Sequence, residues 1–139
     1  MTTDLDVIGQ HARGAARRLM VLSRAEKDAA LHAIADELQA QQQVILDAND
    51  ADMDAAHAAG TNPSLLDRML LTPQRLESIG ADVRKVVELD DPVGEVFDAR
   101  EMPNGLRLHR QRTPLGVVGI IYEARPNVTV DAAALCLKS

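Results

Sequence analysis

The sequence predicts an α/β chain in which several helices precede a β-hairpin and then the first strand–helix unit of a larger, truncated domain. Three observations predict this fold class. Apolar side chains recur at helical spacing up to about residue 89. An Asn-Gly pair at 104–105 separates two segments with strand character. An unbroken apolar run at 115–122 is typical of a parallel strand buried on both faces, and a helical pattern follows it.

The helical region begins over residues 5–22, where one face carries Leu5, Ile8, Ala12, Ala15 and Leu19. Ser23 and Glu26 have the spacing of a capping box, in which each side chain binds the backbone N–H of the other residue. Apolar residues then keep helical spacing as far as Ile45. These signals predict two helices separated near Ser23.

A further helical stretch is expected near 50–59, before Gly60, because glycine is favoured just past a helix end. Asn62-Pro63 and Thr72-Pro73 each place a capping side chain before a proline at the first helical position. The second pair begins a helix that we expect to reach about Leu89.

A β-hairpin is predicted after the helices. Residues 95–102 and 106–112 are the two strand candidates, and Pro103-Asn104-Gly105 is a turn sequence between them. The second candidate is rich in Arg, so the hairpin is expected to face solvent or to lie at an edge. Thr113-Pro114 ends it.

The apolar run from Leu115 to Tyr122 ends before Pro126, and a short helical pattern follows over 129–138. A strand buried on both faces needs a neighbour on each side, because its backbone groups must be paired. No other segment of these 139 residues has the pattern of a second buried parallel strand. The predicted parts are a helical segment at 1–92, the hairpin at 93–112 and an incomplete first βα unit at 113–139.

The formal net charge of −6 is unevenly distributed. Residues 1–99 carry 18 acidic and 9 basic side chains, whereas residues 100–139 carry 3 acidic and 6 basic ones. The acidic part repels nucleic acid and anionic membranes, so neither is expected as a partner. The basic end is compatible with a phosphorylated small molecule and, more readily, with a solvated strand face.

A cytoplasmic location is predicted from the same sequence. Cys136 is the one cysteine, so no internal disulfide can form, which fits a reducing compartment. The first six residues are acidic and lack the apolar run of a secretory signal. No stretch approaches the ~20 apolar residues of a membrane span.

Few residues are candidates for nucleophilic catalysis or metal binding. Cys136 lies near the end of a helical pattern among Ala and Leu residues, so we expect a buried structural cysteine. Gly116 and Gly119 do not form the glycine-rich dinucleotide fingerprint. No metal site is predicted, because metal-ligand spacing is absent among His11, His32, His57 and His109.

The segment Tyr122–Val128 carries an acid, a guanidinium and an amide between a buried strand and a helix. In open α/β sheets ligands bind at this place. The Asn127 amide could donate a hydrogen bond to a developing oxyanion, and Arg125 could pair with a carboxylate or phosphate. A polar loop that satisfies its own backbone explains the same residues equally well.

The block Thr113–Ala133 closely resembles the signature of gamma-glutamyl phosphate reductases, which belong to the aldehyde dehydrogenase superfamily. Further matching pieces occur along nearly the whole chain, at 34–38, 66–68, 71–73, 91–94 and 135–139. The resemblance implies that the third part is the start of an aldehyde-dehydrogenase-like cofactor domain.

The resemblance also implies a reaction. Enzymes of this family reduce L-glutamyl 5-phosphate with NADPH to L-glutamate 5-semialdehyde and phosphate, in proline biosynthesis. A cysteine thiolate attacks the acyl phosphate, and hydride from the nicotinamide then reduces the thioester. The implied partners are this small-molecule substrate and further copies of the chain in a homo-oligomer.

The family's roles carry over to few residues of this chain. Asn127 resembles the asparagine that stabilises the oxyanion, and backbone near Tyr122 and Glu123 is expected to approach the cofactor. The hairpin around Asn104-Gly105 resembles the superfamily's oligomerisation arm. Cys136 does not match the catalytic cysteine, which is expected beyond Ser139, so the 139 residues alone are predicted to be inactive.

Two alternatives to an enzyme fragment remain. The same region occurs in bifunctional enzymes fused to a glutamate kinase, although Met1 directly precedes the first helix and disfavours this. The other alternative is a non-catalytic helical module for interaction or oligomerisation. Thermal melting discriminates, because an independent module melts cooperatively and a fragment with an unpaired buried strand is molten or aggregates.

Overall fold

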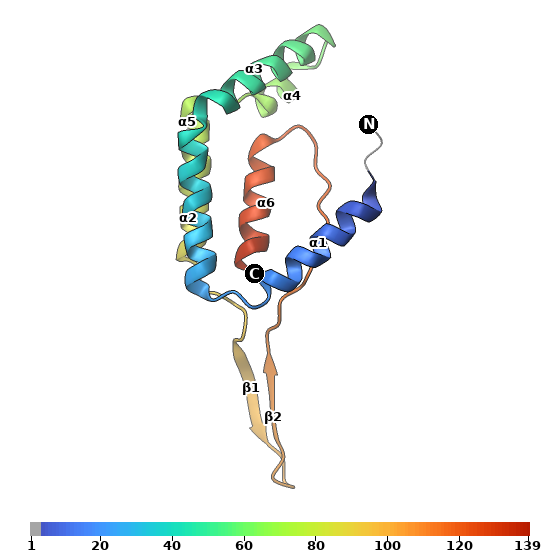
Figure 1. Ribbon diagram of the computed structural model, residues 1–139, viewed down its shortest axis with the longest axis vertical. Helices are drawn as coiled ribbons and strands as arrows, with labels where there is room; N and C mark the ends of the chain where they lie inside the picture. Colours follow the sequence, from blue (N-terminus) through green and yellow to red (C-terminus); the bar gives the residue numbers. More distant parts are fainter. Residues whose placement is uncertain (1–3) are drawn as a thin grey trace.

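A computed structural model describes residues 4–139, which form six helices and two strands. Figure 1 shows their arrangement. In chain order the elements are α1 (Leu5–Leu19), α2 (Arg24–Ala40), α3 (Gln42–Ala58), α4 (Pro63–Met69), α5 (Pro73–Glu88), β1 (Val96–Glu101), β2 (Arg107–Gln111) and α6 (Pro126–Lys138). The predicted order of helices, hairpin and final helix is confirmed.

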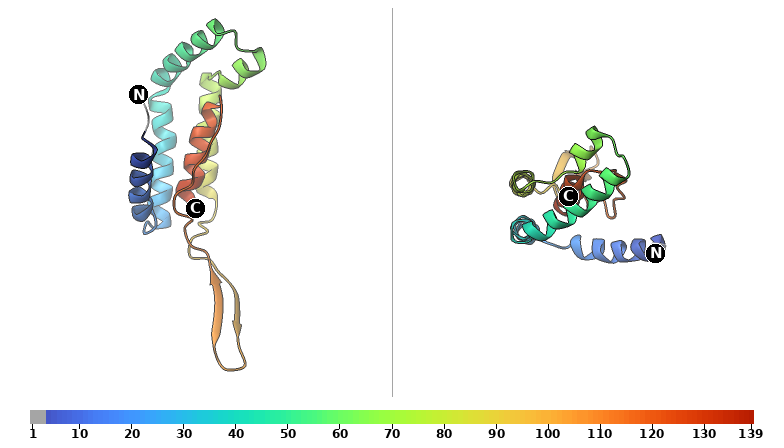
Figure 2. Two further views of the ribbon diagram at one scale, coloured as in Figure 1. Left: turned by 90° about the vertical axis from the view of Figure 1, so that its right-hand side faces the viewer. Right: turned by 90° about the horizontal axis from the view of Figure 1, so that it is seen from above.

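Helices α2, α5 and α6 pack side by side and hold the core (Figures 1 and 2). Leu31 and Ala35 of α2, Val83 of α5 and Ala134 of α6 are buried together. Burial of a Leu or Val side chain contributes roughly 1.5–3 kcal/mol. The two alanines contribute less, so this core is small.

The predicted helix starts are present. The Ser23 N–H donates to Glu26 Oε2 at 2.8 Å and the Glu26 N–H donates to Ser23 Oγ at 3.3 Å, which completes the capping box. The side chains of Asn62 and Thr72 each accept from the N–H three residues later, at 2.9 and 3.1 Å. Local sequence therefore determines where α2, α4 and α5 begin.

The predicted continuation of the second helix to Ile45 is wrong. The helix stops at Gln41, whose φ of −96° and ψ of 14° are not helical, and α3 turns away over α4 (Figure 1). The buried Asn49 amide secures this turn because it donates to the Met69 carbonyl at 2.9 Å and accepts from the Leu71 N–H at 2.7 Å. A tertiary contact thus interrupts a pattern that is locally continuous.

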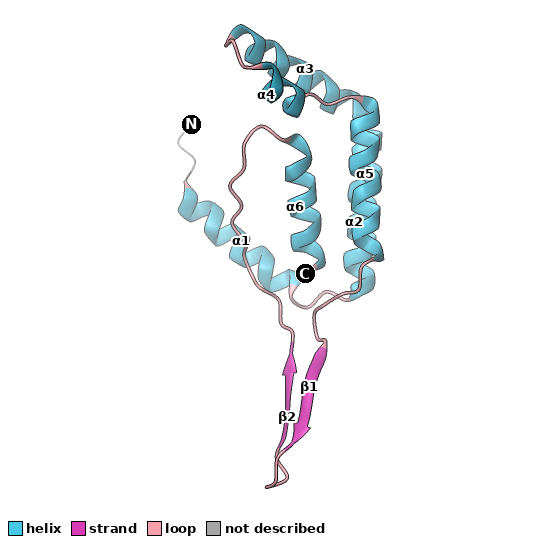
Figure 3. Cartoon of the chain, turned by 180° about the vertical axis from the view of Figure 1, so that it is seen from behind, coloured by secondary structure: helices cyan, strands magenta, loops and turns pink. Residues whose placement is uncertain are grey.

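Strands β1 and β2 pair antiparallel and project beyond the helices (Figure 3). Gly105 has φ +80° in the connecting turn, a backbone conformation that favours glycine. The ladder is interrupted between Phe97 and Arg100, where Asp98 has φ +53°. Every residue of both strands is exposed, as expected for a solvent-facing hairpin.

The predicted strand at 115–122 is absent from this structure. The segment is an exposed coil that runs beside α6 (Figure 3), and the Ile121 side chain is fully exposed. Its backbone finds no ladder partner among residues 4–139, since the only sheet there is the hairpin. The pattern identifies an apolar segment correctly, but a strand forms only where a neighbouring strand is present.

Helix α1 also exposes its apolar face. Leu5, Ile8 and Leu19 are exposed and no residue of α1 is buried. Among the described residues, no surface covers the stripe that predicts this helix.

Candidate functional site

The segment that connects the coil to α6 has a constrained geometry. Ala124 has φ +48°, an unfavourable conformation for a residue with a side chain. Arg125 is the N-cap residue of α6 and its side chain makes no capping bond. The Tyr122 hydroxyl lies 2.6 Å from Thr129 Oγ1, which ties the coil to the first turns of the helix. These features constrain the backbone at the start of α6, from which the Arg125 side chain projects.

Asn127 lies in the first turn of α6 and is exposed. Its Nδ2 donates to Asp131 Oδ2 at 3.1 Å. An amide nitrogen carries two N–H donors, so the second stays free for another acceptor. The hydrogen bond to Asp131 therefore orients the Asn127 amide and leaves one of its two N–H donors available.

A polar hollow of about 320 Å³ lies between α4, α5 and the start of α6. Arg125, the N-cap residue of α6, and Asn127 line it at the start of this helix, and α4 and α5 contribute Asp67, Arg68, Arg75, Ser78 and Asp82. The sequence places Arg125 and Asn127 next to each other, but the approach of Arg68 depends on how α4 packs.

The charges of this hollow are only partly paired. Arg75 donates to Asp67 Oδ1 at 2.7 Å and to the Leu70 carbonyl at 2.9 Å, so it holds the α4–α5 turn. Lys85 donates to Asp82 Oδ1 at 2.8 Å, and this hydrogen bond raises the pKa of Lys85. Within residues 4–139, the guanidiniums of Arg68 and Arg125 have no ion pair or hydrogen bond.

The backbone of Tyr122 and Glu123 is the expected contact for a pyridine nucleotide. Both residues are exposed, and their N–H and C=O groups bind no other backbone group in the described chain. Free donors and acceptors beside Asn127 fit contact with a carboxamide.

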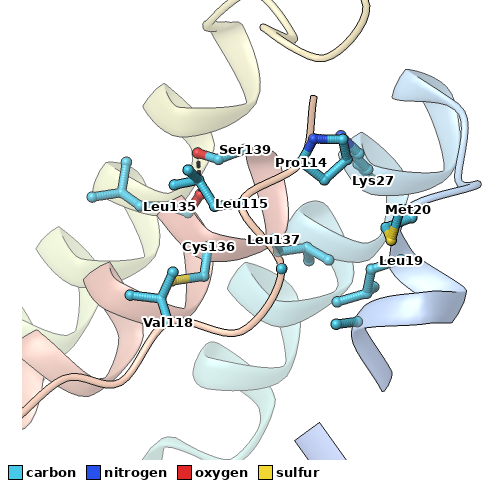
Figure 4. A pocket seen from close by; sticks show the side chains of 12 residues that line it. Leu19, Met20, Lys27, Pro114, Leu115, Val118, Leu135, Cys136, Leu137 and Ser139 are labelled. Carbon is cyan, nitrogen blue, oxygen red and sulfur yellow. Dashed lines mark hydrogen bonds between the residues drawn. The ribbon is translucent and has the colours of Figure 1, made fainter. Parts of the chain in front are cut away.

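The prediction that Cys136 is buried is wrong. The thiol is exposed and lines a more apolar hollow of about 190 Å³ between α1, α6 and the coil at 114–118. Figure 4 shows the Cys136 side chain directed toward Val118 and away from Lys27. The α6 face that carries Cys136 points away from α2 and α5, and the coil covers it only loosely.

A buried charge cluster is the feature that sequence reasoning missed. Lys138 Nζ donates to Asp28 Oδ1 at 2.6 Å and to the Val87 carbonyl at 2.9 Å. Lys27 Nζ lies 3.0 Å from Asp91 Oδ2, and only 4% of Lys27 and 3% of Lys138 is exposed. The cluster joins α2, α6 and the link from α5 to the hairpin.

A signal for this cluster is present in the sequence. Lys27 lies four residues before Leu31, and Lys138 lies four residues after Ala134, so each lysine is on the buried face of its helix. Helical spacing therefore identifies both lysines once the core face is known.

Two other classes of site find no support in the described chain. No three His, Cys, Asp or Glu side chains of residues 4–139 gather in a group that could hold a metal ion. In the same residues, no helix has the length and apolar character needed to cross a membrane.

The chain is 62% identical over 136 residues to a gamma-glutamyl phosphate reductase of Chloroflexus aggregans, which covers 98% of the chain and 32% of the relative. A crystal structure of the Thermotoga maritima gamma-glutamyl phosphate reductase superposes on 94% of the chain with a TM-score of 0.90 and 41% identity. The chain matches one third of a gamma-glutamyl phosphate reductase.

A crystal structure of the Saccharomyces cerevisiae gamma-glutamyl phosphate reductase also matches the chain, with a TM-score of 0.91 and 35% identity. The match includes all of this chain and 35% of the yeast protein. The resemblance inferred from residues 113–133 is confirmed and extends over nearly the whole chain. No protein-family model matches the chain. The chain spans about a third of the length of the gamma-glutamyl phosphate reductases it matches.

Proposed function

We propose that this chain is part of an enzyme that reduces L-glutamyl 5-phosphate with NADPH, giving L-glutamate 5-semialdehyde and phosphate for proline biosynthesis. The observation that carries the proposal is the 62% identity to a gamma-glutamyl phosphate reductase over 98% of the chain. Likeness at this level along the whole chain is far more specific than a shared fold. A cytoplasmic location accords with such a biosynthetic role.

Asn127 supplies a hydrogen bond to the reacting carbonyl oxygen in this proposal. Its second amide N–H is free, and its bond to Asp131 limits rotation of the side chain. A fixed donor favours the transition state because it needs no reorientation as charge develops on the oxygen. The exposed backbone of Tyr122 and Glu123 holds the nicotinamide end of NADPH, which supplies the hydride when bound.

The hairpin supports an oligomeric enzyme. Strands β1 and β2 extend beyond the helices, and both of their outer edges are unpaired in the described chain. Unpaired edges are templates for pairing with another chain. A homo-oligomer that pairs strands through this hairpin is therefore part of the proposal.

The proposal is tested with an extended protein, in which this chain is joined to the remaining two thirds of the Chloroflexus aggregans relative. We expect NADP-dependent oxidation of glutamate 5-semialdehyde in the presence of phosphate, which is the reverse reaction. The 139 residues alone are expected to show no turnover. Asn127→Ala in the extended protein is expected to lower kcat by about 10²–10³.

Asp50→Asn is the control, because Asp50 is exposed on α3, away from the hollow. Absence of activity in the extended protein, with the relative itself active under the same conditions, contradicts the proposed function. Turnover by the isolated chain contradicts its predicted inactivity.

A further inference from the structure

Two arginines that face the polar hollow have no partner within residues 4–139. Arg68 comes from α4 and Arg125 from the residue before α6, and both line the same hollow of about 320 Å³. Every other charged side chain that lines it has a hydrogen-bonded partner, as described above for Arg75, Asp67, Asp82 and Asp131. The hollow therefore has two guanidiniums without a partner, whereas each of its three carboxylates accepts at least one hydrogen bond.

Free guanidiniums in a hollow suit anions with planar or tetrahedral oxygens, because the fork of N–H donors can bind two oxygens at once. Most exposed arginines are merely solvated, so position matters more than charge. Arg125 follows Ala124, whose φ of +48° is unfavourable for a residue with a side chain, and such backbone strain is concentrated at ligand sites. Arg125 is also two residues from Asn127, the proposed oxyanion donor.

We infer that Arg68 and Arg125 bind the anionic groups of the substrate in this hollow, and so select an acyl phosphate that also carries an amino-acid carboxylate. The inference rests on the proposed function and adds the residues that recognise the substrate. Glutamyl phosphate is anionic at both ends, and the reacting carbonyl lies beside one of them. Two cations that reach the hollow from different elements suit such a ligand.

Arg75 cannot take this role, although it lines the same hollow. It donates to the carboxylate and the carbonyl of Asp67 and to the Leu70 carbonyl, so its donors hold the protein rather than a ligand. Substitution of Arg75 would disturb α4. Arg68 and Arg125 are exposed and unbonded, so their substitution leaves the fold intact.

The test measures binding of two probes to the extended protein by calorimetric titration. Inorganic phosphate probes the phosphate site, and L-glutamate probes the carboxylate site. We expect Arg68→Gln and Arg125→Gln each to lower the affinity for at least one probe by about tenfold or more, because charge-assisted bidentate pairs are lost. Arg125→Lys is expected to recover part of the binding, since it restores the charge without the fork.

Arg18→Gln on α1 is the matched control, because its side chain has no ion pair in the described chain and does not line the hollow. The probe affected by each variant tells which anion that arginine binds. Unchanged affinity of both arginine variants for both probes overturns the inference, as does failure of the unmodified extended protein to bind either probe.

Reductase activity is measured separately on the same proteins. If the probes bind in an arginine-dependent way but there is no turnover, the proposed binding site is supported and the proposed reaction is refuted. If both arginine variants turn over with unaltered KM for phosphate and for the semialdehyde, the proposed reaction is supported and the proposed binding site is refuted. Circular dichroism of each variant confirms that the helices are retained.

Discussion

At the scale of single residues, the ionic contacts of Lys27 and Lys138 show how charge is accommodated in a small core. A buried ammonium is costly unless it is paired and hydrogen-bonded. Lys138 meets this condition with Asp28 and the Val87 carbonyl, and Lys27 meets it with Asp91. The cluster lies where α6 meets α2 and the start of the hairpin, so it fixes how these parts are oriented.

Acid is therefore expected to weaken this junction. The hydrogen bond from Lys138 holds the pKa of Asp28 below its usual value. For Asp91, burial raises the pKa, but hydrogen bonds from Val93 and Lys27 outweigh it and the net pKa is also lowered. A lowered folded-state pKa adds stability above the unfolded value of ~3.9 and loses it as pH falls through the folded value.

We predict that Asp28→Asn lowers the urea midpoint of the extended protein at pH 7 and reduces its loss of stability below about pH 4. Asp50→Asn, which removes an exposed carboxylate without a partner, is the control. Equal acid sensitivity in Asp28→Asn and the unmodified protein means that the Lys138 contact is not the acid-sensitive one.

At the scale of elements, the helices and the segment at 115–122 behave differently for one physical reason. A helix satisfies its hydrogen bonds within itself, so caps such as Ser23 and Thr72 define its start locally. A strand satisfies its hydrogen bonds only with another strand. The run at 115–122 is therefore coil here, although its apolar character is clear from the sequence.

Hydrogen exchange measures this difference directly. In the isolated chain, amides of residues 115–121 are expected to exchange at nearly the rate of unfolded peptide, because they have no ladder partner in the described chain. In the extended protein they are expected to be strongly protected. Amides in the middle of α2 are the internal reference, and protection of 115–121 in the isolated chain would contradict this account.

At the scale of the whole molecule, the described chain buries few large side chains and exposes many. Leu31, Leu76 and Val83 are the largest that are fully buried, whereas the whole apolar run and much of α1 are exposed. Exposed apolar surface of this extent marks an interaction surface or an aggregation liability. Because the core is small and rich in Ala, its burial contributes little free energy to keep the chain folded and to oppose aggregation.

We predict that the isolated chain melts without a cooperative transition and self-associates in sedimentation velocity, while the extended protein melts cooperatively. Dye binding to exposed apolar surface is expected in the isolated chain alone. A cooperative, monomeric isolated chain would favour the alternative of an independent helical interaction module. Dilution series at constant temperature separate self-association from slow aggregation.

The candidate site was only partly predictable. Arg125 and Asn127 were found because they follow an apolar run and precede a helix, which is where open α/β sheets bind ligands. The sequence does not identify Arg68 as a site residue, because it lies 57 positions earlier than Arg125 and lines the hollow only through the packing of α4 and α5. Cys136 was misplaced for a related reason, since helical spacing does not tell which face of α6 is covered.

The sequence by itself determined the helix starts, the hairpin turn and the likeness to gamma-glutamyl phosphate reductases, because each depends on neighbouring residues or on an ordered string of them. Only the tertiary structure decided the break at Gln41, the buried lysine cluster, the exposed state of 115–122 and the position of Arg68 and Arg125 in the lining of one hollow. These depend on contacts between distant parts of the chain, and backbone and charged groups take the arrangement in which their partners are actually present.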